Sequence, residues 1–306
     1  MSRTTLLAGG VGGARLARGL AAVVPSEHLT VIVNVGDDDR IYGAHVAADL
    51  DTVTYTLAGV EGPHGWGVAG DTFEVMAAFD TLGADTSFRL GDRDLALCLR
   101  RTEMLDDGVP LSTVTGHVCT ALGVAPTVLP ATDDELRTRI NTREAGWLAF
   151  QDYFVRRGHS DEVIGLEYAG SNGARAAPGV VAAITAADTV FIAPSNPPLS
   201  IQPILAIEEI SAAVIAAPRV VAVSPLFGGK ALKGPADRVM ASLGLPAGNA
   251  GVLAAYNGLI SDLVVDTADR LDADTLEGAV RIHSTNTRFA EAEAAARFAR
   301  WLLDLH

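Results

Sequence analysis

A run of carboxylates near the N-terminus carries the clearest chemical potential in this sequence. The segment NVGDDDR places Asp37, Asp38 and Asp39 side by side, and AADLDTVT follows with Asp49 and Asp51. Adjacent carboxylates repel one another unless water or a cation neutralises them, and Mg²⁺ prefers oxygen ligands. We therefore keep two roles for Asp49, the N-cap of a helix or a ligand of Mg²⁺ together with Asp37. At least one of the three successive acids is expected to be solvated.

A glycine-rich turn at the start of the chain is a second candidate site. The segment AGGVGGARL aligns with the dinucleotide fingerprint G-x-G-x-x-G at Gly10 and Gly12, but Arg15 stands where the third glycine belongs. Glycine still permits positive φ and close backbone approach, and a helix starting near Gly12 directs free N–H groups at an anion. Phosphate contact is therefore favoured over a turn without a ligand for Gly9, Gly10, Gly12 and Gly13.

Two lysines lie in another glycine-rich segment, SPLFGGKALKGP. Lys230 and Lys233 precede a helix predicted to begin at Pro235, although the P-loop order G-x-x-x-x-G-K-[ST] is absent. The chain has a formal net charge of −14, so positive charge for an anionic ligand must be supplied locally. Two lysines beside a helix N-terminus therefore predict a diphosphate clamp.

Arginines near the start of an apolar helical pattern form a further group. In FRLGDRDLALCL, Asp92 as N-cap and Asp94 in the first turn suit the helix dipole, whereas Arg93 opposes it. A cation at that position indicates an anionic or planar partner, with Arg89 close by, or else an ion pair with Asp92 or Glu103.

Short polar side chains also follow a predicted strand in PSNPPLS. Ser195, Asn196 and Ser200 have two interpretations here. They are caps of a helix that begins with proline, or they are donors and acceptors for a base or a ribose.

Short β-branched runs alternate with helical patterns, which predicts a doubly wound, mostly parallel α/β sheet of Rossmann-like type. The expected strands are Thr4–Ala8, Leu29–Val35, Val163–Tyr168, Thr189–Ala193, Val220–Ser224 and Leu263–Asp266, with Ala279–His283 a weaker candidate. Helical patterns between them cover Gly12–Val24, Pro178–Ala187, Ile201–Ala216, Pro235–Leu243 and Asn286–Leu303. Such a sheet binds ligands outside the carboxyl ends of its strands, so the polar segments that follow strands are expected to converge on one edge.

Residues 56–157 break this alternation and predict a mainly helical insertion that caps one end of the sheet. Its helical patterns are Thr72–Thr81, Asp92–Leu105, Leu111–Leu122, Asp134–Asn141 and Ala145–Arg157. We therefore expect a nucleotide-binding core built from residues 1–55 and 158–306, interrupted by this insertion.

The composition excludes several functional classes. A chain with a pI of about 4.8 does not bind nucleic acid through a diffuse basic surface, and no apolar run approaches the ~20 residues that span a bilayer. Cys98 and Cys119 are expected to be reduced core thiols of a cytoplasmic protein. Metal-ligand spacing of histidines and a G-x-S-x-G nucleophile elbow are both absent, so hydrolytic triad chemistry has no support.

With these segments assembled, the chain resembles the 2-phospho-L-lactate transferase family of coenzyme F-420 biosynthesis, whose bacterial members are called phosphoenolpyruvyl transferases. The matching stretches are LAGGVGGARLARGL, NVGDDDRIYGAHVAADLDTVTYTLAG, FRLGDRDLALCLRRTEML, PSNPPLSIQPIL and VSPLFGGKALKGPADRVM, in this order over nearly the whole chain. The resemblance implies that the terminal hydroxyl of the deazaflavin Fo attacks the distal phosphorus of a guanosine diphosphate conjugate of lactate or enolpyruvate. The products are F-420-0, or its dehydro form, and GMP, with Mg²⁺ as cofactor. It also implies a homodimer.

The resemblance further implies roles for single residues. Asp49 and Arg93 contact Fo as the catalytic pair, with Arg89 beside them, and Asp49 alternatively binds the metal or accepts the hydroxyl proton. Trp66 either stacks on the deazaflavin or packs within the protein. The residues expected at the substrates and cofactor are Gly9, Gly10, Gly12, Gly13, Asn34, Asp37, Asp51, Ser195, Asn196, Ser200, Gly229, Lys230 and Lys233.

Two other functions are compatible with parts of the pattern. A related Rossmann-like family suggests a non-catalytic regulator that binds nucleotide sugars, but such a binder has no need of GDRDLA together with the acidic loop. A dinucleotide oxidoreductase is disfavoured by Arg15 in place of the last glycine.

Overall fold

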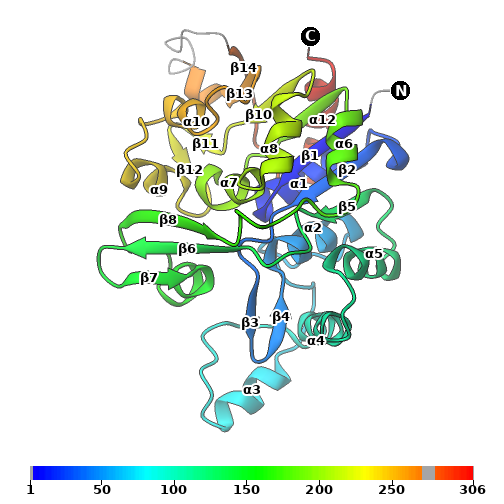
Figure 1. Ribbon diagram of the computed structural model, residues 1–306, viewed down its shortest axis with the longest axis vertical. Helices are drawn as coiled ribbons and strands as arrows, with labels where there is room; N and C mark the ends of the chain where they lie inside the picture. The colour runs from blue at the N-terminus through cyan, green and yellow to red at the C-terminus, as the bar shows by residue number, and fades with distance from the viewer. Residues whose placement is uncertain (1–2, 271–279, 306) are drawn as a thin grey trace.

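The computed structural model describes residues 3–270 and 280–305. Its centre is a seven-stranded parallel sheet in the order β14-β13-β10-β9-β1-β2-β5 (Figure 1). The strands are β1 (Thr4–Ala8), β2 (Leu29–Val33), β5 (Thr127–Pro130), β9 (Thr189–Ile192), β10 (Val220–Val223), β13 (Asp262–Asp266) and β14 (Arg281–Thr285). Most are short aliphatic runs buried on both faces, as parallel strands usually are. The predicted doubly wound α/β class is confirmed.

Helices cover both faces of this sheet because successive strand residues point to opposite sides. Leu6 of β1 packs with one helix layer and Leu7 with the other. The first layer consists of α1 (Gly10–Ala21), α2 (Ala48–Ala58), α5 (Leu111–Ala121) and α12 (Ala292–Leu303). The second consists of α6 (Val180–Ala186), α7 (Gln202–Leu205), α8 (Glu208–Ile215), α9 (Ala236–Ser242) and α10 (Asn249–Ala255).

Two small units lie beyond the carboxyl ends of the parallel strands, in the lower half of Figure 1. One is an antiparallel sheet of β6 (Arg137–Thr142), β7 (Gly146–Ala149) and β8 (Val163–Ala169). The other is a hairpin of β3 (Asp39–Ile41) and β4 (Ala44–Val46), which shares a small apolar core with α3 (Glu74–Thr81) and α4 (Asp92–Asp106). A shorter hairpin of β11 (Leu226–Phe227) and β12 (Lys230–Ala231) follows β10.

The insertion, residues 56–157, contains strands that the sequence did not predict. β5 is an edge strand of the main sheet, and the predicted helices Asp134–Asn141 and Ala145–Arg157 are instead β6 and then β7 with a π-helix at Asp152–Arg156. In β6, buried and less buried residues alternate over RTRINT, which is the two-residue period of a strand. The helices predicted earlier in the insertion are α3, α4 and α5. The insertion is therefore helical at first and then mixed, and β5 makes it part of the core.

Other expected elements shift or break. The strand predicted at Val163–Tyr168 is β8, which pairs antiparallel with β6 and lies outside the parallel sheet. The helix predicted at Ile201–Ala216 is broken into the end of a π-helix (Pro197–Ile201), α7 and α8. β14 begins at Arg281, and Ala279 of its predicted strand lies outside the described residues. The last helix begins at Ala292 rather than at Asn286.

The cysteines and the helix lengths bear on two expectations from composition. Cys98 and Cys119 are free and buried, as predicted. Within residues 3–270 and 280–305, no single helix has the length and apolar character to cross a membrane. One bent pair, Pro197–Leu205 with Glu208–Ile215, meets the criteria only when its two halves are taken together, and these meet at 94°.

Candidate functional site

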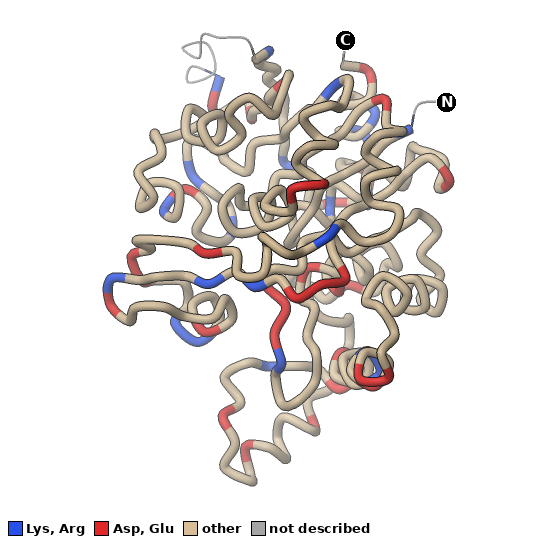
Figure 2. Tube along the Cα trace, in the orientation of Figure 1, with Lys and Arg blue, Asp and Glu red and all other residues tan. Residues whose placement is uncertain are grey.

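The candidate site lies where four loops leave the carboxyl ends of β1, β2, β9 and β10. Acidic segments gather at this edge, where β3 and β4 leave the parallel sheet (Figure 2). Three of these loops contact one another through the hydrogen bonds described below. The convergence expected from the strand order is therefore present.

Asp49 occupies the centre of this edge. It lies in the first turn of α2, is 7% exposed, and accepts hydrogen bonds from the Gly10 N–H at 2.6 Å and from Asn34 Nδ2 at 3.0 Å. The N-cap of α2 is Ala47, so the N-cap interpretation of Asp49 is wrong. Burial raises the pKa of Asp49 to about 6.

Asp37 forms a buried acid pair with Asp49. Asn34 Nδ2 lies 3.3 Å from Asp37 Oδ1, so one neutral amide donates to both carboxylates. Burial, followed by the charge of Asp49, raises the pKa of Asp37 well above its usual range. Two buried carboxylates that share one amide require a proton or a cation between them. Hereafter "the acid pair" means Asp37 and Asp49.

The glycines of the first turn allow neighbouring segments to come close. A Cβ on Gly9 would overlap Asp49 Oδ2, and a Cβ on Gly12 would overlap the Pro194 carbonyl oxygen. Gly10 has a φ of +60°, which few other residues adopt. The N–H of Gly10 is donated to Asp49 and that of Gly9 to Ser195 Oγ at 3.3 Å. These two N–H groups are therefore engaged within the protein, and phosphate contact stays a prediction for the start of α1.

The PSNPPLS segment packs against the same turn. Ser195 Oγ donates to the Gly9 carbonyl at 2.7 Å, and the side chain of Ser200 also lies beside Gly9. Asn196 is an N-cap, since its side-chain oxygen accepts the Leu199 N–H at 3.2 Å. The cap interpretation is thus confirmed for Asn196, while Ser195 holds the glycine turn in place. Contact with a base or ribose remains a prediction.

Asp51 is held in a buried ion pair with Arg101, a residue that the sequence analysis did not select. Arg101 Nη1 lies 3.0 Å from Asp51 Oδ2, while Nη2 binds Oδ1. Arg101 follows Leu95 and Cys98 along the buried stripe of α4, where an apolar residue is expected. A cation at an apolar position is the signal that could have identified it.

A second group of ligand-capable atoms lies around this ion pair. Asp51, Asp94 and Cys98 have ligand atoms within 4.8 Å of one another. The Arg101 guanidinium already neutralises Asp51, and burial raises the pKa of Cys98 far above its usual range. This trio is therefore less suited to a metal ion than the acid pair, whose carboxylates contact no such cation in the part of the chain that the structure describes.

The arginines predicted to meet the acceptor lie around the start of α4. Arg93 is exposed, and the Arg89 guanidinium lies 4.8 Å from the centre of the Phe73 ring. Asp92 does not cap its own helix: its carboxylate accepts the N–H groups of Glu74 and Val75 and so caps α3. The cap of α4 comes from another carboxylate, since Asp71 accepts the N–H groups of Arg93 and Asp94.

The lysine segment reaches across to the loop that holds Trp66. Lys233 Nζ donates to the His64 carbonyl at 2.9 Å and lies 5.2 Å from the centre of the Trp66 ring. Trp66 is 54% exposed. Lys230 is exposed on β12, and the Gly229 N–H is donated to Asp269 at 2.6 Å. Trp66 therefore packs against a lysine of the predicted diphosphate clamp. Stacking of the other face of its ring on a deazaflavin stays a prediction.

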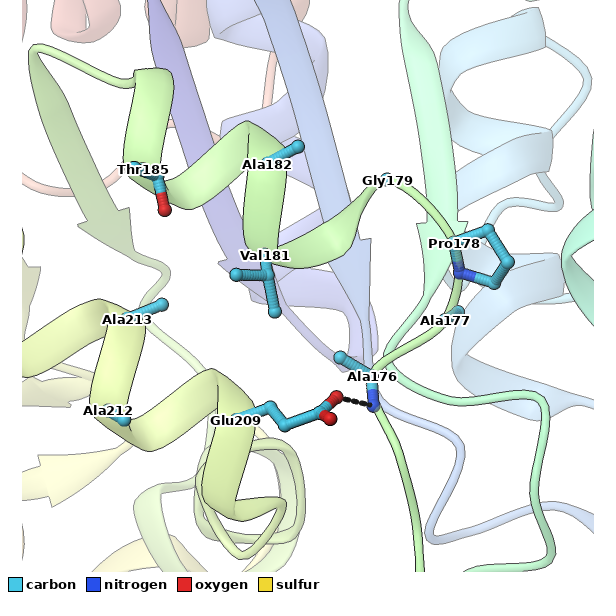
Figure 3. Close-up of a pocket in the computed structure, with 10 residues that line it drawn as sticks. All are labelled: Ala176, Ala177, Pro178, Gly179, Val181, Ala182, Thr185, Glu209, Ala212 and Ala213. Atoms are coloured by element: carbon cyan, nitrogen blue, oxygen red, sulfur yellow. Dashed lines mark hydrogen bonds between the residues drawn. The ribbon is translucent and has the colours of Figure 1, made fainter.

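A hollow on the described surface lies away from this edge. It has a volume of about 590 Å³ and lies between α6 and α8, with small residues along its walls (Figure 3). Its acidic residue, Glu209, accepts the Ala176 N–H at 2.9 Å. None of the residues predicted for the site lines this hollow.

The fold and the position of the site define a class of protein, the doubly wound α/β proteins that bind ligands at the carboxyl ends of parallel strands. The profile of the family described as 2-phospho-L-lactate transferase CofD matches residues 4–299. The chain therefore belongs to the 2-phospho-L-lactate transferase family, and it is a transferase of the phospholactate and phosphoenolpyruvate type. The resemblance found in the sequence is confirmed.

Individual relatives support this assignment. A phosphoenolpyruvate transferase of Kitasatospora aureofaciens is 41% identical, over 99% of this chain and 97% of that protein. A 2-phospho-L-lactate transferase of Methanocaldococcus jannaschii is 36% identical, over 98% of this chain and 97% of that protein. A crystal structure of a UPF0052 family member from Bacillus halodurans has a TM-score of 0.66 at 16% identity, covering 99% of this chain and all of that one. That likeness concerns the fold.

Proposed function

We propose that this chain transfers a phosphoenolpyruvyl or 2-phospho-L-lactyl group from a guanosine diphosphate conjugate to the deazaflavin Fo. The products are dehydro F-420-0 or F-420-0, and GMP. The observation that carries the proposal is the acid pair: two buried carboxylates share one amide donor at the edge of a fold whose family performs this type of transfer. We further propose that the enzyme acts as a homodimer, which sedimentation would test.

The acid pair has the chemistry of a Mg²⁺ site. Mg²⁺ takes oxygen ligands and is commonly held by one or two carboxylates together with substrate phosphates. Asp37 and Asp49 offer such oxygens, and neither is paired with a guanidinium or ammonium group among the described contacts. When bound there, Mg²⁺ would neutralise the charge of the phosphates during transfer.

The protein's own groups supply positioning and proton transfer. The acceptor oxygen forms a bond to the distal phosphorus, the bridging P–O bond to GMP breaks, and the hydroxyl proton leaves. With a pKa of about 6, Asp49 is suited to accept that proton near neutral pH, as an alternative to holding the metal. Lys230 and Lys233 would hold the diphosphate, and Arg93 with Arg89 would hold the acceptor.

The direct test is turnover of defined substrates. Purified protein with Mg²⁺ and Fo receives either guanylylated phosphoenolpyruvate or guanylylated phospholactate, and mass spectrometry identifies the products. We expect GMP in equal amount to a phosphodiester-linked deazaflavin. A protein that binds Fo, monitored by Fo fluorescence, yet forms no GMP from either donor would contradict the proposal and favour a binding protein.

The role of Asp49 is tested by Asp49→Asn. This variant keeps the shape of the side chain but removes its negative charge and its basicity, so transfer is expected to fall at least ~100-fold. The matched control is Asp39→Asn, a carboxylate of the same run that is less buried and lies in β3. Full activity of the Asp49→Asn protein would remove Asp49 from the chemistry.

A further inference from the structure

A buried arginine that the proposed reaction does not use joins three elements around the acid pair. Arg101 of α4 is 3% exposed and forms a two-pronged ion pair with Asp51 of α2. The same Nη1 donates to the His45 carbonyl of β4 at 3.2 Å. Because Asp51 lies one helical turn past Ala47, the N-cap of α2, the guanidinium anchors the turn that carries Asp49.

A second contact ties the same two helices together. Tyr55 Oη donates to Asp94 Oδ1 at 2.8 Å. Asp51 and Tyr55 are four residues apart on α2, and Asp94 and Arg101 are seven apart on α4, so each pair shares one helix face. The two contacts set the position of Asp49 relative to the start of α4, where the acceptor arginines lie.

Arg101 also determines where negative charge remains. Four buried carboxylates interact in this region, and two of them have a basic partner: Asp51 has Arg101, and Asp38 has His45 at 3.0 Å. The other two, which are the acid pair, contact no basic side chain within residues 3–270 and 280–305. Without the guanidinium, Asp51 would add its charge to this group.

We propose that Arg101 is a positioning residue of the transfer reaction. Acting through Asp51 and the His45 carbonyl, it sets the spacing between the acid pair and the acceptor arginines. This inference rests on the proposed function. Arg101 itself contacts neither substrate nor metal in this scheme.

The charged and titratable groups around Asp51 define what a change at Arg101 would disturb. From α4, Arg101, Asp94 and Cys98 face it; from α2, Tyr55; and from the hairpin and its preceding loop, His45 and Asp38.

The experiment compares four variants with the native enzyme. Arg101→Met removes the cation and both contacts, and Arg101→Lys keeps a cation but loses the planar two-pronged geometry. Asp51→Asn combined with Arg101→Met replaces the whole ion pair with neutral groups. The matched control is Arg100→Met, the neighbouring arginine, which is 63% exposed and pairs with Glu103.

The expected results test the geometry that Arg101 imposes. Arg101→Met should lower kcat/KM by about ten-fold or more. Arg101→Lys should raise KM for Fo. The double variant, which has neutral groups in place of the ion pair, should keep the raised KM for Fo. Arg100→Met should match the native enzyme in all of these measurements.

The proposal is overturned if Arg101→Lys retains native kcat and KM, whether or not Arg101→Met folds. It is also overturned if folded Arg101→Met changes only the melting temperature. Fo affinity, measured by Fo fluorescence, follows the placement of the acceptor arginines without any turnover. If the native protein transfers nothing, the proposed function fails, and weaker Fo binding by Arg101→Lys than by Arg100→Met still tests the positioning role of Arg101.

Discussion

Asp49 joins segments that are far apart in the sequence. Its carboxylate accepts the Gly10 N–H from the turn after β1 and the Asn34 amide from the loop after β2. It is therefore a structural acceptor as well as the candidate reactive group. Burial raises the pKa of Asp49 to about 6, and burial with the charge of Asp49 raises the pKa of Asp37. The two residues retain protons in the folded state at a pH where the unfolded chain has released them.

Because the folded protein retains these protons, its free energy of unfolding depends on pH. Carboxyls with raised folded-state pKa values contribute stability that is complete below about pH 4, the unfolded value, and is lost as the pH rises through about 6. Between pH 4 and pH 8, the free energy of unfolding of the native protein without divalent cations should therefore fall by on the order of 2–3 kcal/mol relative to that of a double variant, Asp37→Asn with Asp49→Asn. Thermal melts of both proteins across this range measure the difference.

Millimolar Mg²⁺ should reduce that loss in the native protein and leave the double variant unchanged. Comparing the two proteins removes the contribution of other groups, such as His159, whose pKa burial lowers. Parallel stability curves for the two proteins would show that the acid pair holds no retained proton.

At the scale of elements, glycines determine how closely loops from different strands approach. In the first turn of α1, Gly12 lies against the Pro194 carbonyl. The loop after β2 passes Thr138 of β6 at Gly36, where a Cβ would lie 2.5 Å from Thr138 Oγ1. Carboxylates act between elements in a similar way, since Asp71 caps α4 and Asp92 caps α3. These contacts hold the loops of the site against one another.

Gly12→Ala tests this close approach. Its Cβ would meet a backbone oxygen that cannot move aside, so we expect a loss of about 1–3 kcal/mol of unfolding free energy and a large loss of transfer activity. Gly116→Ala in α5 is the control, because no atom lies within 4 Å of its Cβ and the change should stabilise the helix by about 0.5–1 kcal/mol. Chemical denaturation measures both. Equal stability of the two variants would contradict the packing argument.

At the scale of the whole molecule, the buried carboxylate of Asp262 joins neighbouring strands at the edge of the sheet opposite the site. Asp262 at the start of β13 is fully buried and pairs with Arg219 before β10 and with Arg281 and His283 of β14. Arg219 also donates to the Leu305 carbonyl, which ties down the end of α12. Burial opposes ionisation, but these hydrogen bonds outweigh it and lower the pKa of Asp262 far below its usual range. The site lies at the carboxyl ends of β1, β2 and β9, and the ion pairs of Asp262 lie at the opposite, amino-terminal ends of β10, β13 and β14 in the same sheet.

Asp262→Asn should therefore weaken the fold without changing the chemistry. Asp262 is buried, but Arg219 and Arg281 are 20% and 55% exposed and stay hydrated when the counter-charge is lost, so the expected cost is about 1–3 kcal/mol. Native Asp262 contributes stability above about pH 4 that is lost as the pH falls, so the variant's deficit should shrink in acid. Asp106→Asn, which breaks an exposed pair with Arg40, should cost less than ~1 kcal/mol.

Denaturation midpoints at pH 7 and pH 3 measure this prediction, together with KM for Fo below the melting temperature. A raised KM in the Asp262→Asn protein would mean that the two ends of the sheet are coupled.

The sequence alone determined the parallel core, the family and the loops that meet at one edge. Strands buried on both faces must be aliphatic runs, and the order of strand and helix specifies which loops follow strand ends. These are local signals, and β1, β2, β9, β10 and β13 follow them. The sequence also predicted Asn196 as a cap, and it selected Asp49 and Asp37, which lie close together in the folded chain and whose roles in the reaction stay predictions.

Tertiary structure alone decided which partner each polar group has. The two-residue period of RTRINT fits a strand, but its place in a separate antiparallel sheet depends on pairing with β7 and β8, which are distant in sequence or unpredicted. Similarly, the sequence favours Asp51 as a ligand, whereas the folded chain pairs it with Arg101, fifty residues later. The sequence predicts Asp92 as the cap of its own helix, whereas in the folded chain it caps the start of α3. The charge and pKa of a buried carboxylate depend on which distant groups surround it, and only the folded chain brings those groups together.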